Sequence, residues 1–186
     1  METPANILKA IAGESMARNK YTFFASQAKK EGYEQIAAIF TETADNEKEH
    51  AKRLMKLLPD KKVMATLENY DFPKVGDTAT NLKAAADGEK YEWTSMYPEF
   101  AAKAEEEGYK EAATVFTEIG EVEEEHEKRY LKLMENVKQG KVFKRDQEVY
   151  WRCRNCGYVH KGKEAPKECP ACAHPQSYYE LLAENY

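Results

Sequence analysis

The sequence predicts a mainly α-helical protein: a four-helix bundle with a long connection between its second and third helices, followed by a small β-rich metal-binding domain. The first observation is an internal repeat, because residues 21–53 and 97–129 align without a gap and 16 of the 33 aligned positions are identical. The second is a Glu-x-x-His motif near the end of each copy. The third is that all four cysteines fall within 20 residues near the C-terminal end. A duplicated helical hairpin supplies four helices around one core.

Helix-stopping residues divide the bundle into its elements. The first helix is expected from about Pro4 to Glu31, before Gly32, and the second extends to about Leu58, before Pro59. A connection as short as that at Gly32 forces the two helices to be antiparallel. Residues 60–78 lack helical periodicity and are long enough to cross the bundle, and helices at about 79–107 and 109–138 then repeat the hairpin. We expect a bundle domain over 1–140, a hinge over 141–147 and a metal domain over 148–186.

Four glutamates interrupt apolar stripes that should face the core of the bundle. A buried carboxylate without a partner is strongly destabilising, and no lysine or arginine shares these stripes near the glutamates. In Glu-x-x-His, both side chains lie on one helical face, about one turn apart. A charged helix surface explains one such motif, but not the duplicated pattern. The sequence therefore predicts a site for two metal ions, with six ligands: Glu14, Glu47, His50, Glu89, Glu123 and His126.

The third helix has one residue more than the first. Seven positions separate Glu14 from Tyr21, whereas eight separate Glu89 from Tyr97. Helices often absorb such an insertion as a π-helical turn, and these turns occur at functional sites. Glu92 lies in this stretch and has no equivalent in the first half. We expect it to be a seventh ligand that stabilises the oxidised metals, with a surface charge as the alternative.

Two tyrosines occupy the same position of the repeat. Tyr21 and Tyr97 lie about two helical turns beyond the upstream glutamates. At that distance they are candidates to donate hydrogen bonds to the ligand carboxylates, and ordinary packing is the alternative. Together with Glu92, they are the candidate catalytic residues.

The C-terminal cysteines form two Cys-x-x-Cys pairs separated by 12 residues: Cys153, Cys156, Cys169 and Cys172. Two such pairs converge into a tetrahedral site of four thiolates, which suits iron or zinc. Spacing alone does not distinguish a zinc ribbon from a one-iron centre. Because four thiolates complete the shell, His160 and His174 are not expected to be ligands.

Composition excludes several classes of partner. The net charge of −5 and the absence of a polybasic run argue against nucleic acid. No apolar stretch approaches the roughly 18 residues needed to cross a bilayer. We expect no membrane association and no secretory signal. Clustered cysteines indicate a metal site in a reducing cytoplasm rather than a disulfide framework.

The combined motifs resemble the rubrerythrin family along essentially the whole chain. The resemblance rests on Gly13-Glu14-Ser15, on the two Glu-x-x-His motifs, on residues 88–92 (GEKYE) and on residues 153–158 (CRNCGY). It implies a ferritin-like bundle with a di-iron centre bridged by oxo and carboxylate groups, and a rubredoxin-like domain with one iron. In that family pattern Glu47 and Glu123 are bridging ligands, Glu14 and His50 serve one iron, and Glu89 and His126 serve the other. Glu92 corresponds to the ligand that alternates with His50 as the oxidation state changes.

The resemblance implies a peroxidase of oxidative stress defence that reduces hydrogen peroxide to water. The chain has no Gly-x-Gly-x-x-Gly motif, so its electrons must come from another protein, an NAD(P)H-linked reductase or rubredoxin. A homodimer or higher homo-oligomer is expected, with electron transfer between subunits. The alternatives are a ferroxidase that sequesters iron, and a binding module with a zinc ribbon and a merely structural bundle.

Overall fold

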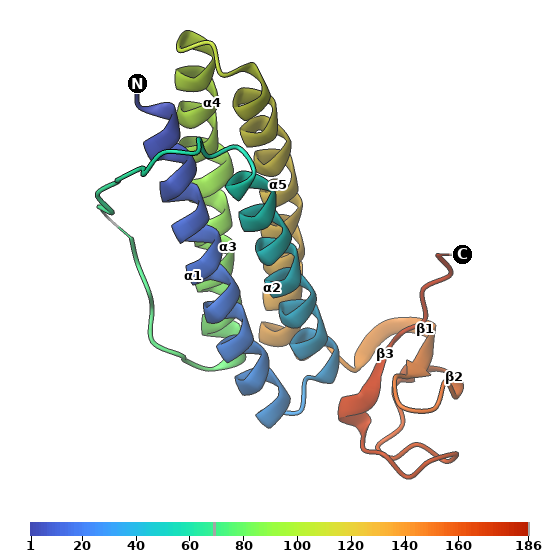
Figure 1. The fold of residues 1–186 in the computed structure, drawn as a ribbon. Helices are drawn as coiled ribbons and strands as arrows, with labels where there is room; N and C mark the ends of the chain where they lie inside the picture. Colours follow the sequence, from blue (N-terminus) through green and yellow to red (C-terminus); the bar gives the residue numbers. More distant parts are fainter. Residues whose placement is uncertain (69, 186) are drawn as a thin grey trace.

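The computed structural model describes residues 1–68 and 70–185, which form a long helical bundle with a small sheet beyond one end (Figure 1). The predicted fold class is confirmed. The helical elements are α1 (Thr3–Lys30), α2 (Glu34–Met55), α3 (Thr78–Tyr91), the π-helix η1 (Glu92–Met96), α4 (Tyr97–Glu106) and α5 (Lys110–Lys138). The second helix ends at Met55, three residues before the predicted end at Leu58.

The two helical hairpins turn in the same way. Gly32 and Gly108 have φ angles of 82° and 80°, a left-handed conformation that side chains disfavour. In the first turn, the N–H of Tyr33 donates to the carbonyl of Ala28 at 2.9 Å, and in the second the equivalent bond measures 2.8 Å. These bonds satisfy carbonyl groups that the end of a helix leaves free. The repeat in the sequence is therefore a repeat of structure.

The predicted π-helical turn is present. Residues Glu92–Met96 form a π-helix that joins α3 to α4 without a change of direction. Pro98 follows at the start of α4, where its missing N–H is tolerated. The extra residue of the second half is thus absorbed next to Glu89, and the residues after the insertion keep their inward orientation. Tyr97 is buried, as is its equivalent Tyr21.

Two apolar clusters fill the bundle. One contains Tyr21, Phe24 and Phe40, and the other contains Ile7, Leu54 and Phe116. Each of the four stripe glutamates, on α1, α2, α3 and α5, lies along the chain between residues of the first cluster and residues of the second. The carboxylates therefore form a polar layer enclosed by apolar packing on both sides.

The connection between α2 and α3 crosses the outside of the bundle (Figure 1). Its described part contains no helix or strand. Tyr70 attaches it to α1 by donating to the carbonyl of Lys9 at 2.7 Å, and Phe72 contacts Phe23 edge-on. Asp77 then caps α3, because its side chain accepts from the N–H of Thr80 at 2.7 Å. This connection lets α3 begin at the same end of the bundle as the turn between α1 and α2.

The small domain is a three-stranded antiparallel sheet with the order β2-β1-β3, built from β1 (Lys144–Cys153), β2 (Val159–Glu164) and β3 (Tyr179–Leu181). Its core is Trp151, Cys153, Ala165, Cys169 and Tyr179. The segment predicted as a hinge is ordered in part, because β1 already begins within it. Phe143 also stacks on Tyr33 of the bundle, with ring centroids 6.1 Å apart. The domain limits 1–140, 141–147 and 148–186 stay a prediction.

Within the described residues, no helix combines the length and the apolar character that crossing a membrane requires.

Candidate metal centres

The six predicted bundle ligands converge in the polar layer. Each end of the layer holds one group of four side chains whose donor atoms lie within 4.8 Å of one another. One group is Glu14, Glu47, His50 and Glu123, and the other is Glu47, Glu89, Glu123 and His126. The four glutamates are at most 2% exposed. α1, α2, α3 and α5 each contribute one glutamate, and α2 and α5 also contribute the histidines.

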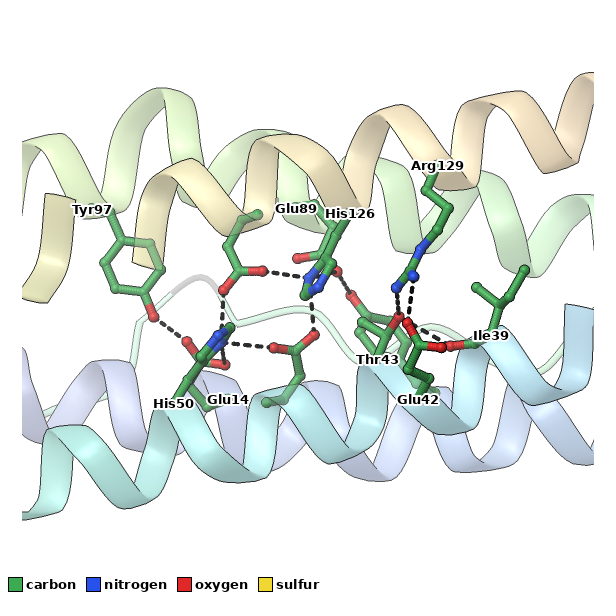
Figure 2. A network of polar contacts seen from close by, with 12 residues as sticks. Glu14, Ile39, Glu42, Thr43, His50, Glu89, Tyr97, His126 and Arg129 are labelled. Carbon is green, nitrogen blue, oxygen red and sulfur yellow. Dashed lines mark hydrogen bonds and ion pairs between the residues drawn. The ribbon is translucent and has the colours of Figure 1, made fainter. Parts of the chain in front are cut away.

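Glu47 and Glu123 belong to both groups. Glu123 directs Oε1 toward Nδ1 of His50, at 3.0 Å, and Oε2 toward Nδ1 of His126, at 2.7 Å. Glu47 also presents one oxygen to each histidine, at 3.0 Å and 3.5 Å. The two imidazole rings face each other with centroids 6.2 Å apart (Figure 2). Two carboxylates that each span two positions are the arrangement that two adjacent metal ions require.

The donor atoms of this layer lack ordinary partners. Seven of them, on Glu14, Glu47, His50, Glu123 and His126, are buried without a hydrogen bond of normal geometry to any described residue. Buried polar atoms are nearly always hydrogen-bonded, and an unpaired one is destabilising. Here the donor atoms of each group lie within 4.8 Å of one another. This donor set of carboxylate oxygens and imidazole nitrogens fits two iron ions.

The electrostatics of Glu47 and Glu123 differ. Burial raises the pKa of Glu47, and the negative charge of Glu123 raises it further. Burial alone would also raise the pKa of Glu123, but hydrogen bonding from His126 and His50 outweighs it and lowers this pKa. In the absence of metal, hydrogen bonding from the histidines thus favours the charged form of Glu123, whereas burial favours the neutral form of Glu47.

Both candidate tyrosines contact a ligand from the opposite half of the repeat. Tyr21 donates to Oε1 of Glu89 at 2.6 Å, and Tyr97 donates to Oε1 of Glu14 (Figure 2). Both side chains are buried. Burial raises the pKa of each tyrosine, and the adjacent carboxylate, Glu89 or Glu14, raises it further, so both hydroxyl groups keep their protons as donors. Each hydrogen bond fixes the orientation of one terminal carboxylate.

Glu92 lies beside the six residues rather than among them. It is half-buried on the π-helix, and it belongs to neither group of converging donor atoms. Burial raises its pKa, as do the negative charges of Glu14 and Glu123, which places the carboxyl group close to the layer. It also borders a cavity of about 810 Å³ between α1, α3 and the crossing connection, together with Lys20 and Met96. The structure therefore puts Glu92 between this cavity and the candidate centre.

The four cysteines converge at the end of the small sheet. Sγ of Cys153 lies 3.8 Å from Sγ of Cys172, and Sγ of Cys156 lies 3.6 Å from Sγ of Cys169. Tetrahedral coordination with metal–sulfur bonds of about 2.3 Å places the sulfurs about 3.8 Å apart, so the site fits one tetrahedral metal ion.

The two cysteine pairs turn alike. The N–H of Gly157 donates to the carbonyl of Cys153 at 2.9 Å, and that of Ala173 donates to Cys169 at 2.8 Å. Gly157 has a φ of 80°, and Ala173, at the equivalent place, has a φ of 55°. Burial alone would raise the pKa of the Cys172 thiol, but the backbone N–H of His174 and neighbouring side chains lower it to about 6. The second cysteine pair thus favours the thiolate of Cys172, which is the metal-binding form.

Comparison with known proteins identifies the two parts. The family model described as Rubrerythrin matches residues 5–134. The chain belongs to the rubrerythrin family. A second model, described as the rubredoxin-like domain of rubrerythrin, matches residues 151–180.

Relatives within the rubrerythrin family match along the whole length. Rubrerythrin of Porphyromonas gingivalis is 57% identical, over 100% of this chain and 92% of its own length. Rubrerythrin of Nitratidesulfovibrio vulgaris is 55% identical, over 99% and 96%. Among solved structures, nigerythrin in a mixed-valence state superimposes with a TM-score of 0.65 at 36% identity, over 97% of this chain and 86% of that one. The family binds iron and contains iron-dependent oxidoreductases.

Sequence reasoning missed the polar contacts that border the rubrerythrin-type bundle site. Arg129 donates to Oγ1 of Thr43 at 2.7 Å and to Glu42 at 2.6 Å, which links α5 to α2 (Figure 2). Thr43 lies one turn before Glu47, and Tyr130 lies one turn after His126. Tyr130 carries a hydroxyl group into the core. Helical spacing from the ligands is the signal that finds both residues.

Proposed function

We propose that this protein is a non-haem di-iron peroxidase that reduces hydrogen peroxide to water and receives its electrons through the four-cysteine site. The observation that carries the proposal is the way in which Glu47 and Glu123 each offer one oxygen to each histidine, in a chain that also holds a one-metal thiolate site. When bound, a pair of ferrous ions supplies two electrons and two Lewis-acid centres for cleavage of the oxygen–oxygen bond.

The distances between the donor atoms support a ligand assignment. Glu14 and His50 would hold one iron, Glu89 and His126 would hold the other, and Glu47 and Glu123 would serve both. Tyr21 and Tyr97 keep the two terminal carboxylates in place by donating to them. Four carboxylates balance the charge of two divalent cations, and neutral imidazoles complete the set.

Glu92 is proposed to be the seventh ligand, recruited when the irons become ferric. Oxidation adds two positive charges to the layer, and a further carboxylate offsets part of them. The position on a π-helix, beside the layer and next to the cavity, suits a side chain that binds in one oxidation state only. The same cavity offers a small oxidant a route toward the site.

The stoichiometry of peroxide reduction determines how many electrons the four-cysteine site must deliver. One hydrogen peroxide takes up two electrons and two protons and yields two water molecules. Cys153, Cys156, Cys169 and Cys172 hold a carrier of single electrons, so that site must be reduced twice for each peroxide. The donor is a separate reductase or rubredoxin of the cytoplasm, because the chain has no nucleotide-binding motif of its own.

The distance between the two sites favours a homodimer. The carboxylate layer lies inside the bundle, between the two apolar clusters, whereas the cysteine domain lies beyond the bundle end (Figure 1). A head-to-tail pair brings the cysteine domain of one subunit to the carboxylate layer of its partner. Mixing a subunit that lacks Glu123 with a subunit that lacks Cys156 tests this arrangement. We expect the mixture to recover activity that neither variant has alone, and no recovery would count against electron transfer between subunits.

Peroxide consumption by Glu92→Ala is the direct test of the proposed chemistry. We expect the variant to fold and bind iron but to turn over peroxide more slowly, with Glu99→Ala as the control, because Glu99 borders the same cavity but is exposed. Unchanged turnover in Glu92→Ala would make Glu92 a surface residue.

Cys156→Ser tests the electron route. Reduction by the donor protein should be lost, while the circular dichroism of the bundle stays unchanged. Iron content settles the broader alternative: a bundle that folds and takes up no iron would refute the whole proposal. Iron that is oxidised by oxygen and retained, without peroxide turnover, would indicate a ferroxidase instead.

A further inference from the structure

Tyr179 buries a hydroxyl group that has no hydrogen-bond partner of normal geometry in the part of the chain that the structure describes. Its side chain is 0% exposed and belongs to the core of the small domain. Burying an unpaired hydroxyl group is unfavourable, and phenylalanine would fill the same space without this cost. The hydroxyl group therefore requires an explanation.

The sheet places this hydroxyl group beside the thiolate site. Tyr179 begins β3 and pairs directly with Cys153, the last residue of β1. Side chains at directly opposed positions of antiparallel strands point to the same face and lie close together. Tyr179 also packs with both Cys153 and Cys169 in the buried core of the domain, and Cys169 is the side-chain contact of its hydroxyl group. The hydroxyl group is thus enclosed among groups that include the cysteine sulfurs.

The cysteine side of the contact is consistent with this orientation. Burial alone would raise the pKa of Cys169, but the Tyr179 hydroxyl group and the backbone N–H of Ala171 outweigh it and lower this pKa. Cys169 is itself buried, so water does not compete for its sulfur. A thiolate at this position is the acceptor that the unpaired hydroxyl group lacks.

We propose that Tyr179 tunes the reduction potential of the four-cysteine iron site by donating a hydrogen bond from its hydroxyl group to the Cys169 thiolate. The site gains one negative charge when its iron is reduced, and that charge is shared with the sulfurs. A hydrogen bond to sulfur stabilises the reduced state more than the oxidised state and so raises the potential. Backbone N–H donors near the other sulfurs do not depend on the side chain, whereas this donor is lost by removal of one oxygen atom.

The inference rests on iron occupying the four-cysteine site, as in the proposed function. The test is a redox titration of that iron in the full-length, iron-loaded protein and in Tyr179→Phe. We expect the midpoint potential to fall in the variant by an amount that lowers the reduced-to-oxidised ratio about tenfold at a fixed applied potential, or about 59 mV for one electron. Tyr178→Phe is the matched control, because it removes a hydroxyl group from the adjacent, half-buried tyrosine.

A second measurement on the same samples is the sulfur-to-iron charge-transfer absorption of the oxidised protein. Loss of the hydrogen bond makes the sulfur a better electron donor, so the band should move to longer wavelength in Tyr179→Phe and stay in place in Tyr178→Phe. Equal potentials in the parent and Tyr179→Phe would overturn the inference, as would an equal shift in both variants. Failure of Tyr179→Phe to bind iron would also overturn it, since a tuning group is not needed for coordination. Absence of any thiolate–iron absorption in the parent would instead refute the proposed function.

Discussion

The two glutamates shared by both groups of donor atoms, Glu47 and Glu123, are expected to have opposite effects on the stability of the metal-free protein. Glu47 and Glu123 occupy matching positions of the repeat, are both buried and belong to both groups of donor atoms. However, Glu123 lies as close to His50 as Glu47 does, at 3.0 Å, and closer to His126, at 2.7 Å compared with 3.5 Å. The pKa of Glu123 is lowered, whereas the pKa of Glu47 is raised. Glu47→Leu should therefore stabilise the metal-free bundle, and Glu123→Leu should destabilise it.

The structure sets the size of each effect. Removing Glu123 leaves buried His50, whose pKa is raised because its carboxylate neighbours outweigh burial, without one of its partners, and breaking a buried ion pair costs about 3–5 kcal/mol. Removing Glu47 relieves a buried carboxyl group with two unpaired oxygens, which should increase the free energy of unfolding by about 1–3 kcal/mol. The two variants should thus differ by roughly 4–8 kcal/mol, although both lose the same type of ligand.

Chemical unfolding in the presence of a chelator measures this difference. Guanidinium titrations of the parent and both variants, followed by helical circular dichroism, give the free energies of unfolding. Because the folded state raises the pKa of Glu47 above its ordinary value of 4.5, the folded parent binds more protons than the unfolded chain. Its stability should therefore fall as the pH rises above about 4.5, and Glu47→Leu should reduce that slope. With iron present, both variants should fail to form the bundle centre.

Equal destabilisation by the two leucine substitutions would refute the reasoning. That result would mean that both carboxylates are equivalent partners of the histidines in the absence of metal. A stabilised Glu123→Leu would refute it as well, because the histidines would then need no anionic partner.

Three further predictions concern the frame around the sites. Glu107 accepts hydrogen bonds from the N–H and hydroxyl group of Thr3, and the bond from the Thr3 N–H lowers its pKa to about 2. The stabilising effect of Glu107 is therefore complete above about pH 4.5 and lost as the pH falls toward 2. Glu107→Gln should thus weaken the pH dependence of the melting temperature over that interval. Glu105→Gln, at an exposed position of the same turn, is the control. Phe116→Ala should lower the free energy of unfolding by about 3–5 kcal/mol in denaturant titrations, since the ring is 0% exposed. A loss below about 1 kcal/mol would contradict close packing of the apolar cluster that contains Phe116. Ala173→Gly should slow metal release from the cysteine site, because a left-handed φ of 55° costs alanine about 1 kcal/mol more than glycine. Faster release from the variant would contradict the idea that Ala173 is strained.

The sequence predicted the bundle because its signals are local and duplicated. Gly32 and Gly108 end helices in the same conformation, and the extra residue after Glu89 became the π-helix that its position indicated. The six bundle ligands could be chosen because a glutamate on an apolar stripe has few alternatives to a metal. Helical spacing fixes which side chains share a face, so the repeat alone placed them on the inner faces of four helices.

Other features depend on contacts between distant segments. Tyr21 and Tyr97 each contact the glutamate of the opposite repeat, and no spacing within one helix contains that pairing. The segment expected to be a hinge is held by Phe143 against Tyr33, and β1 begins within it. Glu92 lies beside the layer instead of within it, because the π-helix sets its direction and the cavity leaves it room.

By itself, the sequence determined the helical hairpins, the candidate ligand residues and the four-cysteine loop, because periodicity, glycine positions and motif spacing act within a few residues of chain. Only the tertiary structure decided that His126 lies closer to Glu123 than to Glu47, and that Tyr179 packs with Cys153 and Cys169 in one buried cluster. These outcomes depend on angstrom-scale distances between side chains from different elements, and on the burial that makes such distances matter.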